Sequence, residues 1–333
     1  MSKIFDPATT FNFTPASFVP FKDRELCEKL RKISGTDLEK HTRADQHPEF
    51  NIKVMMNPHP VLIATLFARI KEASEKGKKI TLILGNPEPD TYIPLAQLIN
   101  YFQVDCRNVH LFAMDEWADQ DGNIAPETYQ AGFAHSMLKY LVYQIDEKLR
   151  MPLENVHYPT TENIAHYSDM ITECGEGGAD ICSSSPGWTG HMAFIDPVPD
   201  FFPEGFDPAV PPTQAQIDEW LNMKARIVDL HPLTVAQNSL HGVFGQSGYI
   251  ADVPPKAATI GPVDVKNARE RIEVHALLTN STFSSWQRMT SRLVLHGPVT
   301  PLVPSSMLQT MKTQVLVSDE LAAPFDCWEK VGY

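Results

Sequence analysis

The chain of 333 residues is long enough to bury a large core, and 43% hydrophobic with 21% charged residues is typical of a globular protein. A net charge of -13 without clustered lysine and arginine argues against a nucleic-acid surface. The sequence shows no signal peptide, no membrane span and no metal-binding spacing among its five scattered cysteines, so we expect a cytoplasmic protein with reduced thiols and a small-molecule partner.

Residues 1–50 lack a clean periodicity, apart from a short helix that leucine and isoleucine spacing predicts over 25–33. We interpret these residues as an N-terminal extension packed on the main domain. Residues 51–333 are then expected to form a single α/β domain. Within it, the Pro- and Phe-rich stretch 197–212 predicts an inserted surface loop or lid, with the insertion lying near 197–225.

The rest of the domain alternates between helical and strand patterns. After Pro60, the apolar residues Leu62, Leu66 and Ile70 predict one face of a helix. The segments that follow are a strand at 80–84, a helix at 93–102, a strand at 109–114, a loop from Asp115, a helix from about 127 to 141, a helix at 164–173, a strand at 179–182, a loop at 183–190, a strand at 272–278, a helix at 286–295 and a strand at 313–317. This alternation predicts a three-layer α/β fold: a mostly parallel, doubly wound, Rossmann-like sheet with helices on both faces.

Open parallel sheets bind ligands at the carboxyl ends of their strands, so the loops after the strands are where chemistry is expected. Asp115 and Glu116 follow one apolar strand, where partial desolvation would raise a carboxylate pKa toward the range useful for proton transfer. The alternative is that Asp115 only caps the following turn.

A second segment, Gly187-Trp-Thr-Gly-His-Met-Ala-Phe-Ile-Asp-Pro197, follows the strand that ends at Cys182. Its glycines allow close approach of a ligand, and His191 with Asp196 could form an acid/base pair. A structural histidine in a glycine-rich turn is the alternative. A third segment, Gly85-Asn-Pro-Glu-Pro-Asp90, stands where an anion-binding loop would be expected, but its prolines and acids favour a simple turn.

The order of these segments resembles the glucosamine-6-phosphate deaminase/isomerase family, whose relatives include the 6-phosphogluconolactonases. The resemblance runs from about residue 51 to the C-terminus. Phe112-Ala-Met-Asp-Glu-Trp117 is similar to the family's Met-Asp-Glu-Tyr segment, and Pro126-Glu-Thr-Tyr129 to its Pro-Glu-Ser-Tyr. The Gly-His segment matches the family's Asp-Gly-His-Ile-Ala-Phe-Asn-Glu-Pro, and Val235-Ala-Gln-Asn-Ser239 its Val-Ala-Asn-Ser.

The resemblance implies that Asp115 shuttles a proton between sugar carbons 1 and 2, and Glu116 beside it is expected to be catalytic too. It also implies that His191, with Asp196 in place of the usual Glu, opens the sugar ring. The expected substrate-binding residues are Gly85, Asn86, Tyr129, Gly187, Thr189, Gly190 and Arg288. No cofactor and no metal are expected, and a homo-oligomer is compatible with the family.

The chain also departs from the family pattern. Thr189 stands where the family has an Asp, and the residues implied to hold phosphate are replaced by Asn86-Pro-Glu-Pro89, Leu240 and Gln287. Three functions therefore stay open: an isomerase or deaminase acting on a sugar or sugar phosphate, with the substrate altered; a lactonase-type hydrolase; and a catalytically inactive sugar-binding protein of the same fold.

Overall fold

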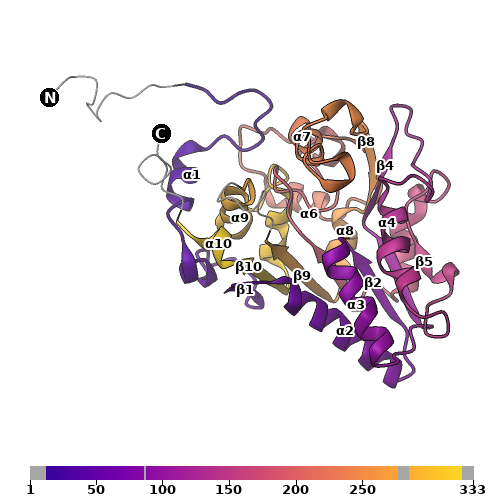
Figure 1. Cartoon of the computed structure of the whole chain (residues 1–333). Helices are drawn as coiled ribbons and strands as arrows, with labels where there is room; N and C mark the ends of the chain where they lie inside the picture. Colours follow the sequence, from indigo (N-terminus) through magenta and orange to yellow (C-terminus); the bar gives the residue numbers. More distant parts are fainter. Residues whose placement is uncertain (1–12, 86–87, 277–284, 325–333) are drawn as a thin grey trace.

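A parallel sheet of seven strands forms the centre of the computed structural model, which describes residues 13–85, 88–276 and 285–324 (Figure 1). In order across the sheet, the strands are β1 (Phe50–Met55), β10 (Thr313–Ser318), β9 (Glu270–His275), β6 (Ile181–Ser184), β2 (Ile80–Leu84), β3 (Val109–Ala113) and β5 (Val156–His157). Every neighbouring pair runs parallel. The predicted α/β fold with a mostly parallel sheet is confirmed.

Helices cover both faces of this sheet, and each face has its own apolar core. One face carries α2 (His59–Glu75), α3 (Pro89–Tyr101) and most of α4 (Phe133–Tyr140). The other face carries α5 (Tyr167–Cys174), α6 (Gln214–Trp220), α7 (Pro232–Asn238), α8 (Pro262–Asn267), α9 (Gln287–His296) and α10 (Asp319–Ala322). Central strands such as β2 are buried along their whole length, as expected for a strand covered on both sides.

Most predicted elements lie where the apolar pattern placed them. The predicted strand at 80–84 is β2, and Leu62, Leu66 and Ile70 form the buried face of α2. The helix expected from about 127 begins only at Phe133, because Pro126 and Gly132 bracket a turn that precedes it. The predicted strand at 179–182 is shifted by two residues in β6, and residues 277 and 278 of another predicted strand lie outside the described part of the chain.

The prediction of a loop from Asp115 is wrong, because the chain continues there into a second, three-stranded sheet. That sheet consists of β4 (Asp115–Ala118), β8 (Lys256–Thr259) and β7 (Arg226–Asp229), all paired antiparallel. Met114 joins the two sheets: its N–H donates to the carbonyl of Leu84 at 3.2 Å, and its carbonyl accepts from Ile260 at 2.8 Å. This junction fixes the direction in which Asp115 leaves the central sheet.

The N-terminal residues lie against the core on the face of the sheet that carries α9. The short helix α1 (Arg24–Leu30) packs beside α9, and the buried Arg292 guanidinium donates to the carbonyls of Ile33 and Leu321 at 3.0 and 2.7 Å (Figure 1). The stretch predicted as an insertion contains α6, whose Trp220 is fully buried. None of the helices in the described ranges is long and apolar enough to cross a membrane.

Candidate functional site

The strand order reverses direction between β2 and β6, and a cavity opens at that point. From β2 the chain moves outward to β3 and β5, and it then returns to the other side of β2 as β6. A cavity of about 100 Å³ lies beyond the carboxyl ends of these strands, lined by Gly85 after β2, Asp115 after β3 and His191 after β6. A crevice at such a reversal is the usual ligand site of open α/β sheets.

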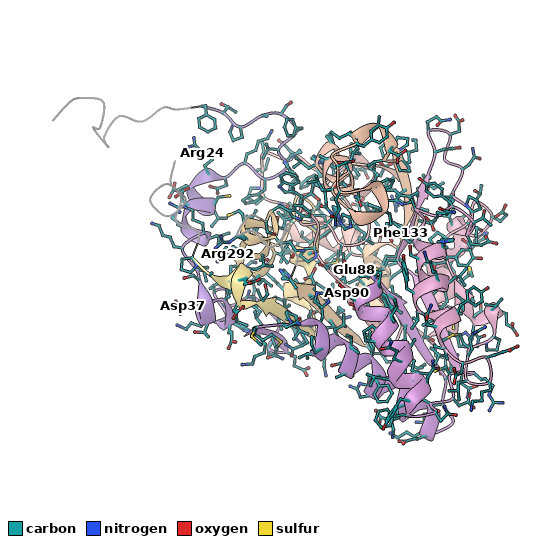
Figure 2. The ribbon with its side chains drawn as sticks, in the orientation of Figure 1. Arg24, Asp37, Glu88, Asp90, Phe133 and Arg292 are labelled. Atoms are coloured by element: carbon teal, nitrogen blue, oxygen red, sulfur yellow. The ribbon has the colours of Figure 1, made fainter. Side chains whose placement is uncertain are left out.

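A wider groove of about 910 Å³ adjoins this cavity. The two hollows share Glu88, Phe133, Asn238 and His241 in their walls. Figure 2 labels Glu88, Asp90 and Phe133, which approach the groove from α3 and α4. The small cavity alone is below the roughly 300 Å³ of an ordinary ligand pocket, whereas the two together can hold a sugar.

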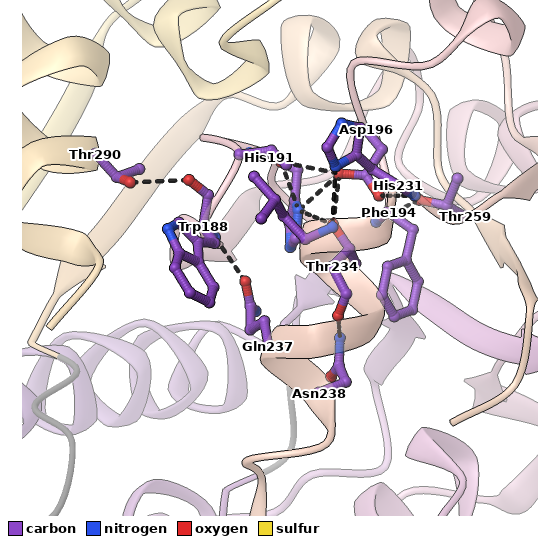
Figure 3. A network of polar contacts seen from close by, with 12 residues as sticks. Trp188, His191, Phe194, Asp196, His231, Thr234, Gln237, Asn238, Thr259 and Thr290 are labelled. Atoms are coloured by element: carbon purple, nitrogen blue, oxygen red, sulfur yellow. Dashed lines mark hydrogen bonds and ion pairs between the residues drawn. The ribbon is translucent and has the colours of Figure 1, made fainter. Parts of the chain in front are cut away.

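His191 is the centre of a buried polar network in the smaller cavity (Figure 3). Its Nδ1 lies 2.8 Å from Oδ1 of Asp196, 2.9 Å from Oγ1 of Thr189 and 3.1 Å from Oγ1 of Thr234. Both threonine hydroxyls also donate to Oδ1 of Asp196 at 2.9 Å. Because a carboxylate only accepts, Nδ1 of His191 carries the proton, which leaves Nε2 as the nitrogen that can exchange a proton with a ligand.

Asp196 is fully buried, and four donors surround it. The fourth donor is the backbone N–H of His231, 3.1 Å from Oδ2 and just before α7. Burial alone would raise the pKa of Asp196, but the attraction of His191 and these hydrogen bonds hold the pKa below its usual value. Asp196 is therefore an anion next to the imidazole across the neutral pH range.

The loop that carries His191 is fixed on three sides. The N–H of Trp188 donates to Oε1 of Gln237 in α7 at 2.6 Å, and its carbonyl accepts from Oγ1 of Thr290 in α9 at 3.0 Å (Figure 3). A Cβ at Gly187 would lie 2.0 Å from Nε2 of His191, so only glycine allows the ring its observed position. We expected this glycine to allow close approach of a ligand, and the structure shows that it makes room for the imidazole.

Asp115 faces the same cavity as His191 and is 7% exposed. Burial in the first place, and the neighbouring Glu116 in the second, raise the pKa of Asp115 well above its usual value. Within the described ranges, no hydrogen bond reaches its carboxyl group. This carboxyl group is thus free to meet a ligand and binds a proton strongly.

Glu116 faces away from Asp115, as alternation along β4 requires. Its carboxylate accepts from the backbone N–H groups of Phe133 and Ala134, the first residues of α4, at 3.2 and 2.7 Å. Burial raises the pKa of Glu116 to about 7 against the effect of these hydrogen bonds. The residue holds the start of α4 and does not line the cavity, so the expectation that Glu116 is catalytic is wrong.

The remaining residues that the sequence singled out are dispersed. Gly85 and Gly187 line the small cavity, Thr189 lies behind His191, and Tyr129 lines the wide groove. Gly190 turns the chain at φ 80° against Val303. Arg288 is directed away from both hollows, because its guanidinium donates to the carbonyls of Ala323 and Pro324 at 3.0 and 2.7 Å. Asn86 lies outside the described residues.

Sequence reasoning missed several residues of the site on α7. Thr234 reaches the His191–Asp196 pair, Gln237 and Asn238 line the cavity, and so does His241, three residues after α7 ends. The available signal was His231-Pro232, because a proline at the first helical position marks the start of a helix. This start lies close to residues 235–239, which resemble the family's Val-Ala-Asn-Ser segment. Gln287, noted only as a replacement, also lines the cavity and donates to the carbonyl of Pro186 at 2.7 Å.

Known proteins resemble the chain in sequence and in fold. It is 25% identical over 287 residues to the glucosamine-6-phosphate deaminase of Alkaliphilus oremlandii, with 83% of this chain and 98% of that protein covered. Glucosamine-6-phosphate deaminase 2 of Bacillus subtilis is 26% identical over 282 residues, which cover 82% and 96% of the two chains. No family model matches the chain.

Two solved structures extend the comparison to the fold. A monomeric glucosamine-6-phosphate deaminase superposes with a TM-score of 0.61 at 18% identity, covering 81% of this chain and 98% of that one. The 6-phosphogluconolactonase of Trypanosoma cruzi superposes with a TM-score of 0.56 at 14% identity, covering 86% and 100%. The chain is thus similar in sequence to glucosamine-6-phosphate deaminases, and it has the fold that the solved deaminase and 6-phosphogluconolactonase structures share.

Proposed function

We propose that the protein is a cytoplasmic sugar isomerase or deaminase that moves a proton between carbons 1 and 2 of an open-chain amino sugar or amino-sugar phosphate. The observation that carries the proposal is the cavity between β2, β3 and β6, into which Asp115 and His191 both project. The names of the sequence relatives, glucosamine-6-phosphate deaminases, support the same chemistry.

In this proposal Asp115 is the base that acts on carbon. Its carboxylate removes the proton from carbon 2 while the carbonyl oxygen on carbon 1 takes up a proton, which gives an enolamine. The same carboxyl group then returns the proton to carbon 1, and water adds to the resulting carbon-2 iminium so that ammonia leaves and the ketose remains. A carboxyl group whose pKa is raised by burial holds a transferred proton more strongly than an exposed one. The absence of hydrogen-bond donors to Asp115 within the described part of the chain leaves its oxygens available for this transfer.

His191 handles the ring oxygen of the sugar. With its Nδ1 proton directed at Asp196, Nε2 can take up a proton and deliver it to the ring oxygen as the ring opens. The buried carboxylate stabilises the imidazolium that exists between these two steps. Thr189 and Thr234 orient the pair without charge, and Glu116 positions α4 and touches no substrate.

The test is proton NMR in deuterated buffer with glucosamine and glucosamine 6-phosphate, each followed for loss of the carbon-2 proton signal and for formation of ketose or ammonium. We expect exchange with at least one of the two sugars. Asp115→Asn should lower the exchange rate at least about 100-fold, since positioned acid/base groups contribute 10²- to 10⁴-fold.

Asp121→Asn is the matched control, because Asp121 is an exposed aspartate six positions away that lines neither hollow. It should leave the rate within about twofold of the wild type. If Asp115→Asn retained full exchange, or if neither sugar exchanged, the proposed function would be wrong. Hydrolysis of a sugar lactone without carbon-2 exchange would select the lactonase alternative.

A further inference from the structure

The walls of the site carry acids and, among the described residues, no lysine or arginine. Glu88, Asp90, Asp115 and Asp252 line the small cavity or the wide groove. The two internal segments outside the described residues, 86–87 and 277–284, contain no basic residue in the sequence either. A phosphate dianion is normally held by arginine or lysine side chains or by backbone N–H groups.

The start of α3 offers no such backbone cradle. Pro89 is the first residue of that helix and has no N–H, and the N–H groups of Thr91 and Tyr92 donate to the carbonyl of Glu88 at 3.1 and 3.0 Å. The carboxylates of Glu88 and Asp90 stand at the same helix start, where a phosphate would otherwise gain from the helix dipole. A dianion there would meet like charge.

The interior of the cavity also penalises negative charge. Burial, with a smaller contribution from Asp90, raises the pKa of Glu88, and burial raises that of Asp115. Both shifts mean that an anion in this cavity loses hydration that the walls do not replace. A phosphate group would suffer the same loss without a lysine or arginine to offset it. A protonated amine brings the opposite charge, which would favour the ionised form of these carboxyl groups and pair with it.

We propose that the site selects an unphosphorylated amino sugar, carried as the ammonium form, over its 6-phosphate. Besides the acids, a second observation supports this choice of ligand: the Asp115 carboxyl group is more than nine-tenths buried, projects into the cavity and receives no hydrogen bond within the described part of the chain. This inference rests on the proposed function for the reaction, but it concerns binding and can be tested without turnover.

The test measures binding of glucosamine and of glucosamine 6-phosphate to the whole protein by titration calorimetry at fixed ionic strength. Like-charge contacts disfavour binding at an interface, so we expect glucosamine to bind at least about tenfold more tightly than its 6-phosphate. The carbon-2 exchange experiment on the same samples separates the proposed reaction from the proposed selectivity for the unphosphorylated sugar. Preferred binding of glucosamine with no exchange would refute only the proposed function, and exchange with preferred binding of the phosphate would refute only this inference.

A variant with an added positive charge tests whether the missing cation causes the preference for glucosamine. Leu240→Arg places a cation on the wall of the wide groove, at a side chain that is 38% exposed and therefore tolerant of replacement. It should improve binding of glucosamine 6-phosphate relative to glucosamine by up to about fivefold, the fold-change that corresponds to the roughly 1 kcal/mol of a favourable exposed charge pair. Val61→Arg makes the same charge change on α2, outside both hollows, and should leave the ratio unchanged.

Three outcomes would overturn the inference, and two of them concern the wild type. One is equal or tighter binding of the 6-phosphate by the wild type, and the other is binding of neither sugar. A ratio that shifts equally in Leu240→Arg and Val61→Arg would also overturn it, since the selectivity would then follow net charge and not the walls of the groove.

Discussion

Asp196→Asn changes one buried atom, so its consequences can be worked out from the contacts of the carboxylate. All four neighbours of Asp196 donate: His191, Thr189 and Thr234 to Oδ1, and the His231 N–H to Oδ2. An asparagine has one acceptor oxygen, which will take the Oδ1 position with three donors. Its amide group then faces the N–H of His231, and two donors are left opposed.

The stability cost follows from that single mismatch. A buried polar group without a partner costs about 1–3 kcal/mol, so we expect Asp196→Asn to lower the free energy of unfolding by that amount at pH 7. The activity cost should be larger, because the imidazolium of His191 loses the anion that stabilises it. We expect kcat/KM to fall by about 10²- to 10⁴-fold.

The pH dependence gives a second, independent signature. The pKa of Asp196 is lowered in the folded protein, so its contribution to stability is present above the ordinary aspartate pKa of about 3.9. That contribution is lost as the pH falls through the lower folded value. The difference in unfolding free energy between wild type and Asp196→Asn should therefore be full at pH 7 and shrink below about pH 4.

Urea unfolding at pH 7, 5 and 3.5 measures this difference. Asp229→Asn is the control: its side chain is 72% exposed and pairs with Lys256, so its removal should cost less than about 1 kcal/mol. A constant difference at all three pH values, or an unchanged kcat/KM, would refute the assignment of Asp196 as the anionic partner of His191.

Two further changes test the supports of the site. Burial raises the pKa of Glu116 from 4.5 to about 7, so the stability that the protonated side chain confers is present at low pH and lost as the pH rises. Urea unfolding at pH 5 and 8 should show the wild type losing about 2.5 kcal/mol relative to Glu116→Gln, and equal losses in the two proteins would contradict this. Gly187→Ala puts a methyl group 2.0 Å from Nε2 of His191, so the imidazole must move. Steady-state kinetics should show kcat/KM reduced about 100-fold. Normal activity would mean that the position of the imidazole ring is unimportant.

The sequence predicted the central sheet well because its strands are buried on both faces. Continuous apolar runs such as Ile80–Leu84 carry their own signal, and the helices beside them show a four-residue repeat. The edge strand Phe50–Met55 was missed although it alternates buried and exposed residues at its start. The strands β7 and β8 are only four residues long, and their pairing with β4 depends on contacts distant in sequence.

The site was predictable where it lies within one segment and not where it is assembled from several. His191 and Asp196 are five residues apart, and the prediction that they could pair matches the 2.8 Å contact. Thr234 joins them from α7, more than thirty-five positions away, and no local pattern announces that approach. Asp115 and Glu116 were treated together, but alternation along β4 directs them to opposite sides.

Thr189 is best understood through the charge balance around His191. A protonated imidazole carries one positive charge, and the fully buried Asp196 already supplies one negative charge at 2.8 Å. A second carboxylate at position 189 would lie within about 3 Å of the first, and two buried like charges at that distance cannot both remain ionised. With Asp196 charged, a hydroxyl group that donates to it fits position 189 better than an acid. Thr189 therefore removes one of the two acids that the resemblance places beside His191, and Asp196 remains as the buried anion that pairs with the imidazole.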